Sequence, residues 1–177
     1  MKKILINIAI IMIFIFTYLL QANFFTSFKI AGVMPNLFIL LVLYIGLFMG
    51  KNYGIIYGII FGLLTDIFIS KQIGFTSIML AIIGIIAHIF DKNFSKDSRI
   101  TLMSMVGVTT VIYEIGIHLL KYLLLGINLE IIAFLKILAI EVIYNIILTI
   151  IIYPIIQTTG YDVEELFKGS KILTRYF

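Results

Sequence analysis

Long apolar runs, separated by short polar breaks, make up most of this sequence. The six runs cover residues 4–20, 33–49, 53–69, 73–90, 102–125 and 131–156. A helix of about 17 residues or more can cross the hydrocarbon core of a bilayer, which is about 30 Å thick. The runs are continuous and lack the alternation of a membrane barrel, so we expect an all-α integral membrane protein with six transmembrane helices in a compact bundle.

The breaks between these runs predict the connections. The three-residue breaks at 50–52 and 70–72 force neighbouring helices to be antiparallel. The polar segment 91–99 is the longest break inside the bundle, and 126–128 is expected to separate the fifth helix from the sixth. Residues 23–32 are expected to form a partly apolar first loop that can lie in the membrane interface.

The two ends of the chain fall outside this pattern. We expect one transmembrane domain over residues 1–156 and a short cytoplasmic tail over 157–177, in which 162–167 can form an amphipathic helical turn. Lys2 and Lys3 precede the first run, as in a signal peptide. However, the run is longer than a signal-peptide core and no A-x-A cleavage site follows it. We therefore expect the first run to be a retained helix.

Composition excludes an ordinary water-soluble globule. Of the 177 residues, 62% are hydrophobic and only 12% are charged, and the mean hydropathy is +1.18. A soluble domain is about half apolar and about a quarter charged. The sequence has no Cys, which excludes disulfides and thiolate-based metal sites. The net charge of +4 does not indicate nucleic-acid binding, because in a membrane protein the placement of Lys and Arg matters more than their sum.

The placement of the positive charges predicts an orientation. If the N-terminus lies inside, nine of the 13 Lys and Arg residues fall on the inner side: Lys2, Lys3, Lys51, Lys92, Lys96, Arg99, Lys168, Lys171 and Arg175. Lys29 and Lys71 fall on the outer side, and Lys121 and Lys136 lie in or beside helices. Because cytoplasmic loops carry an excess of Lys and Arg, we expect both termini to be cytoplasmic.

The third run carries the sharpest pattern, a glycine at every fourth residue. Gly54, Gly58 and Gly62 form a stripe along one side of a helix, and Asp66 continues it near the outer end. Glycines at this spacing let another helix approach closely, either inside the bundle, which is the commoner use, or from another membrane protein. A carboxylate at membrane depth is a candidate functional group, and Asp66 can equally hold the turn at 70–72.

Polar side chains also recur within the fifth and sixth runs. Four of them share one face of the fifth helix: Thr110, Glu114, His118 and Lys121. Three more share one face of the sixth helix: Glu141, Asn145 and Thr149. Such groups face the interior of a bundle. Three interpretations stay open, namely a polar seam between the two helices, a pocket for a small molecule such as a vitamin, and a proton relay.

Patterns typical of enzymes and metal sites do not occur. His88 and His118 are the two histidines, and they fall in different helices with no Cys to complete a zinc site. The sequence has no phosphate-binding glycine loop and no HExxH or GxSxG pattern. We therefore expect no enzyme activity, no metal and no cofactor.

The segment 35–74 resembles a known family, the rod shape-determining protein MreD family. The residues that carry the resemblance are Pro35, Asn36, Leu37, Gly54, Gly58, Gly62, Leu63, Leu64, Asp66 and Gly74. The family more often has Asp where this chain has Asn36. The length, the six expected spans and the inner termini also agree with the family.

The resemblance implies a non-enzymatic subunit of the bacterial cell-elongation machinery, in the cytoplasmic membrane. Proteins of this family lie beside the single-span scaffold MreC and work with the actin-like MreB and the peptidoglycan synthases of the side wall. It therefore implies that Pro35, Asn36, the glycine stripe and Asp66 are candidates for helix packing or for binding a partner. Nucleic acids and small-molecule ligands are not expected.

An alternative is the vitamin-binding S-component of an energy-coupling-factor transporter, whose fold MreD proteins resemble. The polar residues of the fifth and sixth helices would then line a vitamin pocket. Three features argue against it: the sequence has no Trp, its outer loops hold few polar residues, and its first helix has no stripe of small residues.

Overall fold

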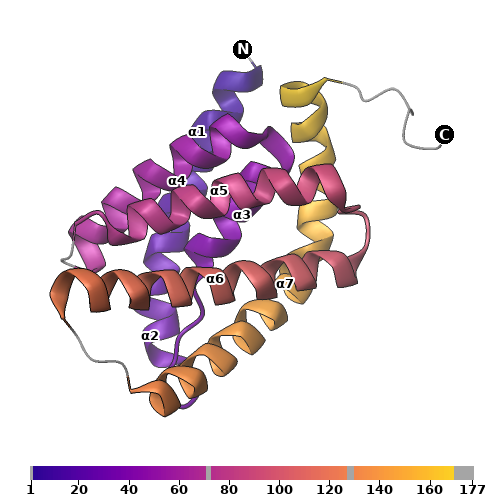
Figure 1. The fold of residues 1–177 in the computed structure, drawn as a ribbon. Helices are drawn as coiled ribbons and strands as arrows, with labels where there is room; N and C mark the ends of the chain where they lie inside the picture. Colours follow the sequence, from indigo (N-terminus) through magenta and orange to yellow (C-terminus); the bar gives the residue numbers. More distant parts are fainter. Residues whose placement is uncertain (1, 71–72, 127–129, 170–177) are drawn as a thin grey trace.

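The computed structural model describes residues 2–70, 73–126 and 130–169, and within these ranges the chain is helical with no strands (Figure 1). Six helices form the bundle: α1 (Lys2–Leu19), α3 (Leu37–Met49), α4 (Lys51–Thr65), α5 (Phe75–Asn93), α6 (Arg99–Leu125) and α7 (Ile131–Lys168). A π-helical turn, Leu20–Phe24, continues α1 into the short α2 (Phe25–Ser27), and a second one, Asp66–Ser70, ends α4. The expected breaks at 70–72 and 126–128, and the end of the tail, lie largely outside the described residues.

Five helical segments of the described chain are long and apolar enough to cross a membrane, which makes this a multi-pass membrane protein. They are Lys2–Ser27, Lys51–Ile69, Phe75–Asn93, Arg99–Leu125 and Ile131–Lys168. The remaining helix, α3, has 13 residues and is therefore about 20 Å long, shorter than the hydrocarbon core of about 30 Å. The expectation of six full spans is corrected to five spans and one shorter apolar helix.

The expected run 33–49 becomes helical only at Leu37. Pro35 has no N–H to donate and disfavours helical backbone in the residue before it. Asn36 is also extended, with φ −111° and ψ 90°. At the other end of α3, Gly50 alone connects it to α4, in place of the expected three-residue break, and its φ of +99° favours glycine.

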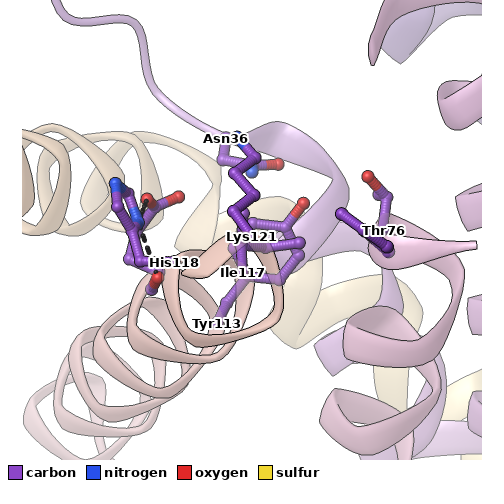
Figure 2. A pocket seen from close by; sticks show the side chains of 8 residues that line it. Asn36, Thr76, Tyr113, Ile117, His118 and Lys121 are labelled. Carbon is purple, nitrogen blue, oxygen red and sulfur yellow. Dashed lines mark hydrogen bonds and ion pairs between the residues drawn. The ribbon is translucent and has the colours of Figure 1, made fainter. Parts of the chain in front are cut away.

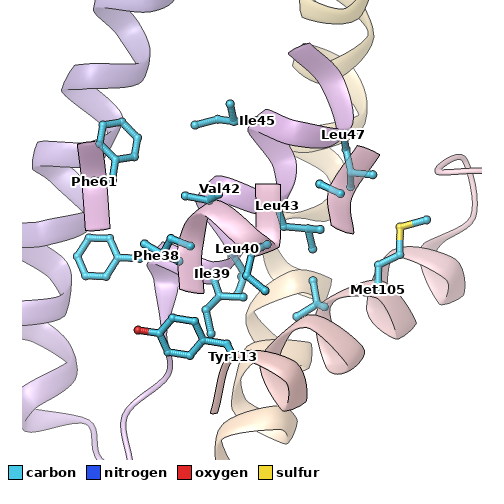
Figure 3. Close-up of a cluster of buried hydrophobic side chains, with 14 of the residues drawn as sticks. Phe38, Ile39, Leu40, Val42, Leu43, Ile45, Leu47, Phe61, Met105 and Tyr113 are labelled. Atoms are coloured by element: carbon cyan, nitrogen blue, oxygen red, sulfur yellow. The ribbon is translucent and has the colours of Figure 1, made fainter. Parts of the chain in front are cut away.

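The shorter helix α3 lies at the centre of the bundle. Eleven of its 13 residues are buried. Figure 3 shows its side chains, among them Phe38 and Leu43, between Phe61 of α4 on one side and Met105 of α6 on the other. Because protein surrounds α3, the extended backbone before it can exist at membrane depth without facing lipid.

The first and the last helix of the bundle are both longer than expected. The first one continues through Ser27, so the expected loop at 23–32 is corrected to a non-helical connection that starts at Phe28. The last one, α7, has 38 residues, about 57 Å in length, and it runs through the expected boundary at 156 to Lys168. Pro154 lies within it and removes one helix hydrogen bond; α7 changes direction along its length (Figure 1).

The two chain ends described by the structure lie at the same end of the bundle (Figure 1). The Lys3 ammonium group lies 5.5 Å from the centre of the Phe167 ring. We call this end, which holds Lys2, Gly50 and Lys168, the basal end. The opposite end, which holds Asn36, Gly74 and Lys121, is the distal end.

Candidate functional site

A buried polar seam joins α6, α7 and the start of α3. The Asn145 amide nitrogen donates to Thr110 Oγ1 (3.0 Å), and Asn145 Oδ1 accepts from the backbone N–H of Asn36 (2.9 Å). One turn further along α7, Thr149 Oγ1 accepts from the Tyr44 hydroxyl of α3 (3.5 Å). Asn145, Thr110 and Thr149 are fully buried. Since lipid offers these groups no alternative partner, the seam holds the three elements in register.

The backbone at the start of α3 also forms hydrogen bonds with the turn that follows α1. Gln21 Nε2 donates to the Pro35 carbonyl (2.6 Å), and Gln21 Oε1 accepts from the Leu37 N–H (3.3 Å). Pro35 and Asn36 therefore lie between the π-helical turn after α1 and the middle of α7. Gln21 was not predicted as a site residue, because it is a single polar residue at the end of an apolar run.

The acidic residues of the two helices meet closer to the distal end. The carboxyl groups of Glu114 on α6 and Glu141 on α7 interact directly. Glu141 is 6% exposed, and its Oε1 has no hydrogen-bond partner. His118 Nδ1 lies 2.9 Å from the Glu114 carbonyl oxygen and 3.6 Å from Glu114 Oε2. The structure therefore brings together most of the polar residues that the spacing placed on one face.

A pocket of about 210 Å³ opens beside this pair (Figure 2). Its lining residues are Asn36, Phe75, Thr76, Tyr113, Glu114, Ile117, His118 and Lys121. Figure 2 shows His118 on one side of the pocket and Thr76 on the other, with Asn36, Lys121 and Tyr113 between them. Tyr113 interacts with the side chains of Thr76 and Asn36, while Asn36 Oδ1 is buried without a hydrogen-bond partner. The described part of the chain contains no cluster of three or more His, Asp or Glu residues suited to a metal ion.

The glycine stripe of α4 faces the neighbouring helix α5. A Cβ atom added to Gly58 would lie 2.5 Å from the Leu80 carbonyl oxygen, and one added to Gly62 would collide with the Ser77 Cα. Both obstacles are backbone atoms, which cannot move aside as a flexible side chain does. This face of α4 is therefore covered by the same chain.

Glycines from three helices complete this contact. A Cβ on Gly54 would lie 2.9 Å from the Cα of Gly46 on α3 and 3.1 Å from the Cα of Gly84 on α5. A Cβ on Gly46 would lie 2.5 Å from the Ala87 Cβ. Gly46 and Gly84 were not predicted as contact residues. The three-residue spacing of Ala81, Gly84 and Ala87 is the signal that could have indicated a small-residue face on α5.

Asp66 caps the start of α5. Its carboxylate accepts hydrogen bonds from the backbone N–H groups of Gly74 (2.8 Å), Thr76 (3.2 Å) and Ser77 (3.3 Å), and its side chain is fully buried. A carboxylate at a helix N-terminus satisfies unpaired N–H groups and meets the positive end of the helix dipole. Gly74 takes a left-handed conformation (φ +103°) that favours glycine. The spacing between Asp66 and Gly74 therefore has a structural role.

Four charged side chains form a cluster at the basal end that was not predicted from the sequence. Lys96 Nζ lies 2.7 Å from both Asp91 Oδ1 and Glu164 Oε2, and Lys168 Nζ lies 2.7 Å from Asp91 Oδ2 and 3.4 Å from Glu164 Oε1. Both ammonium groups also donate to the carbonyl oxygen of Leu47 in the last turn of α3. Among the described residues, two cations thus pair with two anions and satisfy one carbonyl group at a helix C-terminus.

The connection between α5 and α6 is held by the same part of α7. The Asp97 carbonyl oxygen accepts from the Tyr153 hydroxyl (2.8 Å) and from Gln157 Nε2 (2.8 Å), and Tyr161 donates to Asp97 Oδ1. Residues 157–168, which belong to the segment expected to be a polar tail, therefore pack on the basal end of the bundle.

Comparisons with known proteins give one match. The family model of the rod shape-determining protein MreD matches residues 1–159. No curated protein and no solved structure matches the chain. The family match includes Pro35, the glycine stripe, the Asp66 cap and the polar seam, and it covers far more than half of the sequence. This membrane protein therefore belongs to the rod shape-determining MreD family.

Proposed function

We propose that this chain is a non-enzymatic subunit of the bacterial cell-elongation complex, which binds an MreC-like scaffold in the cytoplasmic membrane. Through this scaffold, MreB and the peptidoglycan synthases, it helps to control cell shape and side-wall synthesis. The observation that carries the proposal is the family match over residues 1–159. The lack of a catalytic pattern in the sequence agrees with a binding role.

The distribution of charge supports an orientation for this subunit. Lys2, Lys51, Lys92, Arg99 and Lys168 lie at the helix ends that form the basal end. The positively charged side of a membrane protein faces the cytoplasm. We therefore assign the basal end, with both described chain ends, to the cytoplasmic side.

The face of α1 that points away from the bundle is the surface we assign to the scaffold. The glycine stripe is not available, because α5 covers it. By contrast, α1 buries only Ile10, Phe14 and Thr17, and its other side exposes large apolar residues: Leu5, Ile8, Met12, Phe16 and Leu19. A single-span helix can pack along such a face within the membrane.

Disulfide cross-linking tests this assignment, because the natural sequence has no Cys to interfere. Single Cys residues replace Ile8 or Met12 on α1, and the matched control replaces Val108, an exposed residue of α6 at a similar distance from the basal end. The scaffold carries one Cys at successive positions of its transmembrane helix. We expect cross-links from Ile8→Cys and Met12→Cys and none from Val108→Cys. Cross-links from Val108→Cys alone would contradict the α1 surface, and a scaffold that neither cross-links nor co-purifies would contradict the proposed function.

A further inference from the structure

We propose that the distal pocket binds a small zwitterion of amino-acid size, with its ammonium group at Glu114 and its carboxylate at Lys121. This goes beyond the proposed function, which needs no ligand, and departs from the expectation from sequence that no small molecule binds. The inference rests on the charges that line the pocket, on its polar floor and on its volume.

The charges around the pocket have both signs at separate positions. Glu114 contributes a carboxyl group that already interacts with the buried carboxyl group of Glu141. Lys121 lies seven residues further along α6 and lines the same pocket, and its ammonium group acts on the Glu114 carboxyl group. A simple anion would meet the acids, and a simple cation would meet Lys121. A molecule with both groups can pair each of its charges with an opposite one.

The acid pair also lacks a partner that a ligand can supply. Glu141 Oε1 is buried without a hydrogen bond, and His118 contacts Glu114 but not Glu141 in the described interactions. Two adjacent buried carboxyl groups repel each other unless a proton or a cation lies between or beside them. The ammonium group of a ligand at Glu114 would stabilise this pair.

The rest of the lining suits a short side chain and a polar backbone. Asn36 Oδ1 is buried and unpartnered, so it can accept a hydrogen bond from a ligand. Thr76 and Tyr113 add hydroxyl groups, whereas Phe75 and Ile117 add apolar surface. A volume of about 210 Å³ is below the range of about 300–1,000 Å³ for drug-sized ligands, which favours a ligand the size of an amino acid over one the size of a vitamin.

The walls of the pocket are held in place by contacts that do not involve a ligand. Asn145 fixes Asn36 at the start of α3, and Asp66 fixes Thr76 at the start of α5. A ligand would therefore enter a preformed site and would not have to order it, which favours binding.

The test uses the purified full-length chain in lipid nanodiscs and three probes of similar shape. Leucine, as either enantiomer, carries both charges; isoamylamine lacks the carboxylate, and 4-methylpentanoate lacks the ammonium group. Calorimetric titration is expected to show saturable binding of leucine at least tenfold tighter than binding of either single-charge probe. Equal binding of the three probes, or no saturable binding of either leucine enantiomer up to millimolar concentrations, would overturn the proposal and leave a water-filled pocket.

Two variants separate the roles of the charges. Lys121→Met is expected to weaken leucine binding at least tenfold and to leave isoamylamine binding unchanged, and Glu114→Gln is expected to weaken both. Lys136→Met is the matched control, because Lys136 is an exposed residue of α7 that does not line the pocket. If Glu114→Gln does not fold, leucine binding by the Lys121→Met variant, which is changed at the pocket rim, still tests the site. Unchanged leucine binding in Lys121→Met would contradict the site.

Discussion

The ammonium nitrogen of Lys168 lies 2.7 Å from Asp91 Oδ2, so the last turn of α7 is ion-paired to the last turn of α5, 77 residues earlier in the chain. The same nitrogen donates to the carbonyl oxygen of Leu47 at the end of α3. Three helices are therefore tied together at the basal end by one side chain. This contact makes residues 157–168 part of the folded bundle.

Replacing Lys168 tests whether this cluster stabilises the fold. Lys168→Met removes one of the two described cations that pair with Asp91 and Glu164, and breaking a buried charge pair in this way is expected to lower the free energy of unfolding by about 3 kcal/mol. The control is Lys92→Met, an exposed lysine one residue after Asp91, with an expected change within about 0.5 kcal/mol. Unfolding by sodium dodecyl sulfate in mixed micelles measures both. Equal changes in the two variants would show that the cluster does not stabilise the bundle.

The glycine contact predicts a large response to a single methyl group. Gly58→Ala places a Cβ 2.5 Å from the Leu80 carbonyl oxygen, so α4 and α5 must move apart, at an expected loss of about 1–3 kcal/mol of stability. Gly107→Ala on α6 is the control, because its nearest atom would lie 3.7 Å away, an ordinary contact. That change is expected to be neutral or stabilising, since Ala favours a helix over Gly. The same unfolding assay compares the two, and a Gly58→Ala variant as stable as Gly107→Ala would refute the close contact.

The Asp66 cap predicts a graded effect of two substitutions. Asp66→Ala leaves the N–H groups of Gly74, Thr76 and Ser77 without the carboxylate, and we expect a loss of about 1–3 kcal/mol. Asp66→Asn keeps one acceptor oxygen and is expected to lose less. Asp162→Ala, at an exposed position of α7, is the control. Thermal unfolding followed by circular dichroism measures the order, and a stable Asp66→Ala variant would contradict the capping role.

The hydrogen bond between Asn145 and Thr110 predicts coupling between two helices. Asn145→Ala and Thr110→Val are each expected to destabilise the bundle, and their double-mutant cycle is expected to give a coupling energy of about 0.6–1.7 kcal/mol, between the average and the maximum measured for such bonds in membranes. A cycle between Asn145→Ala and Thr101→Val is expected to be additive, because the described hydrogen bonds of Asn145 do not include Thr101. A coupling energy of zero in the first cycle would mean that the seam contributes no stability through this bond.

Local spacing explains which features could be predicted from the sequence. Each predicted feature involves residues that are close together in the sequence. These features are the glycine stripe, the Asp66 and Gly74 pair, and the polar faces of the fifth and sixth helices. Their periodicity therefore indicated where they would meet a neighbour. The same reasoning located the apolar helices, because lipid demands long apolar segments whatever their tertiary contacts.

Contacts between distant segments could not be predicted in this way. Lys96 and Lys168 were used as orientation signals, whereas Asp91 and Glu164 fell in the separate segments 91–99 and 162–167, and no spacing relates the four before the helices pack. Gln21 and Gly84 likewise gain their roles from partners far along the chain. The short length of α3 was missed because a hydrophobic run does not distinguish a helix inside a bundle from one that crosses the membrane.

Affinity purification of the tagged full-length chain from bacterial membranes, followed by mass spectrometry, decides whether the chain is a partner of the elongation scaffold. An untagged strain and a tagged, unrelated multi-pass protein give the background. We predict specific enrichment of an MreC-like scaffold, with MreB or a side-wall peptidoglycan synthase enriched to a lesser degree. A scaffold that stays at background while transporter ATPases are enriched would contradict the proposed function and favour the transporter alternative.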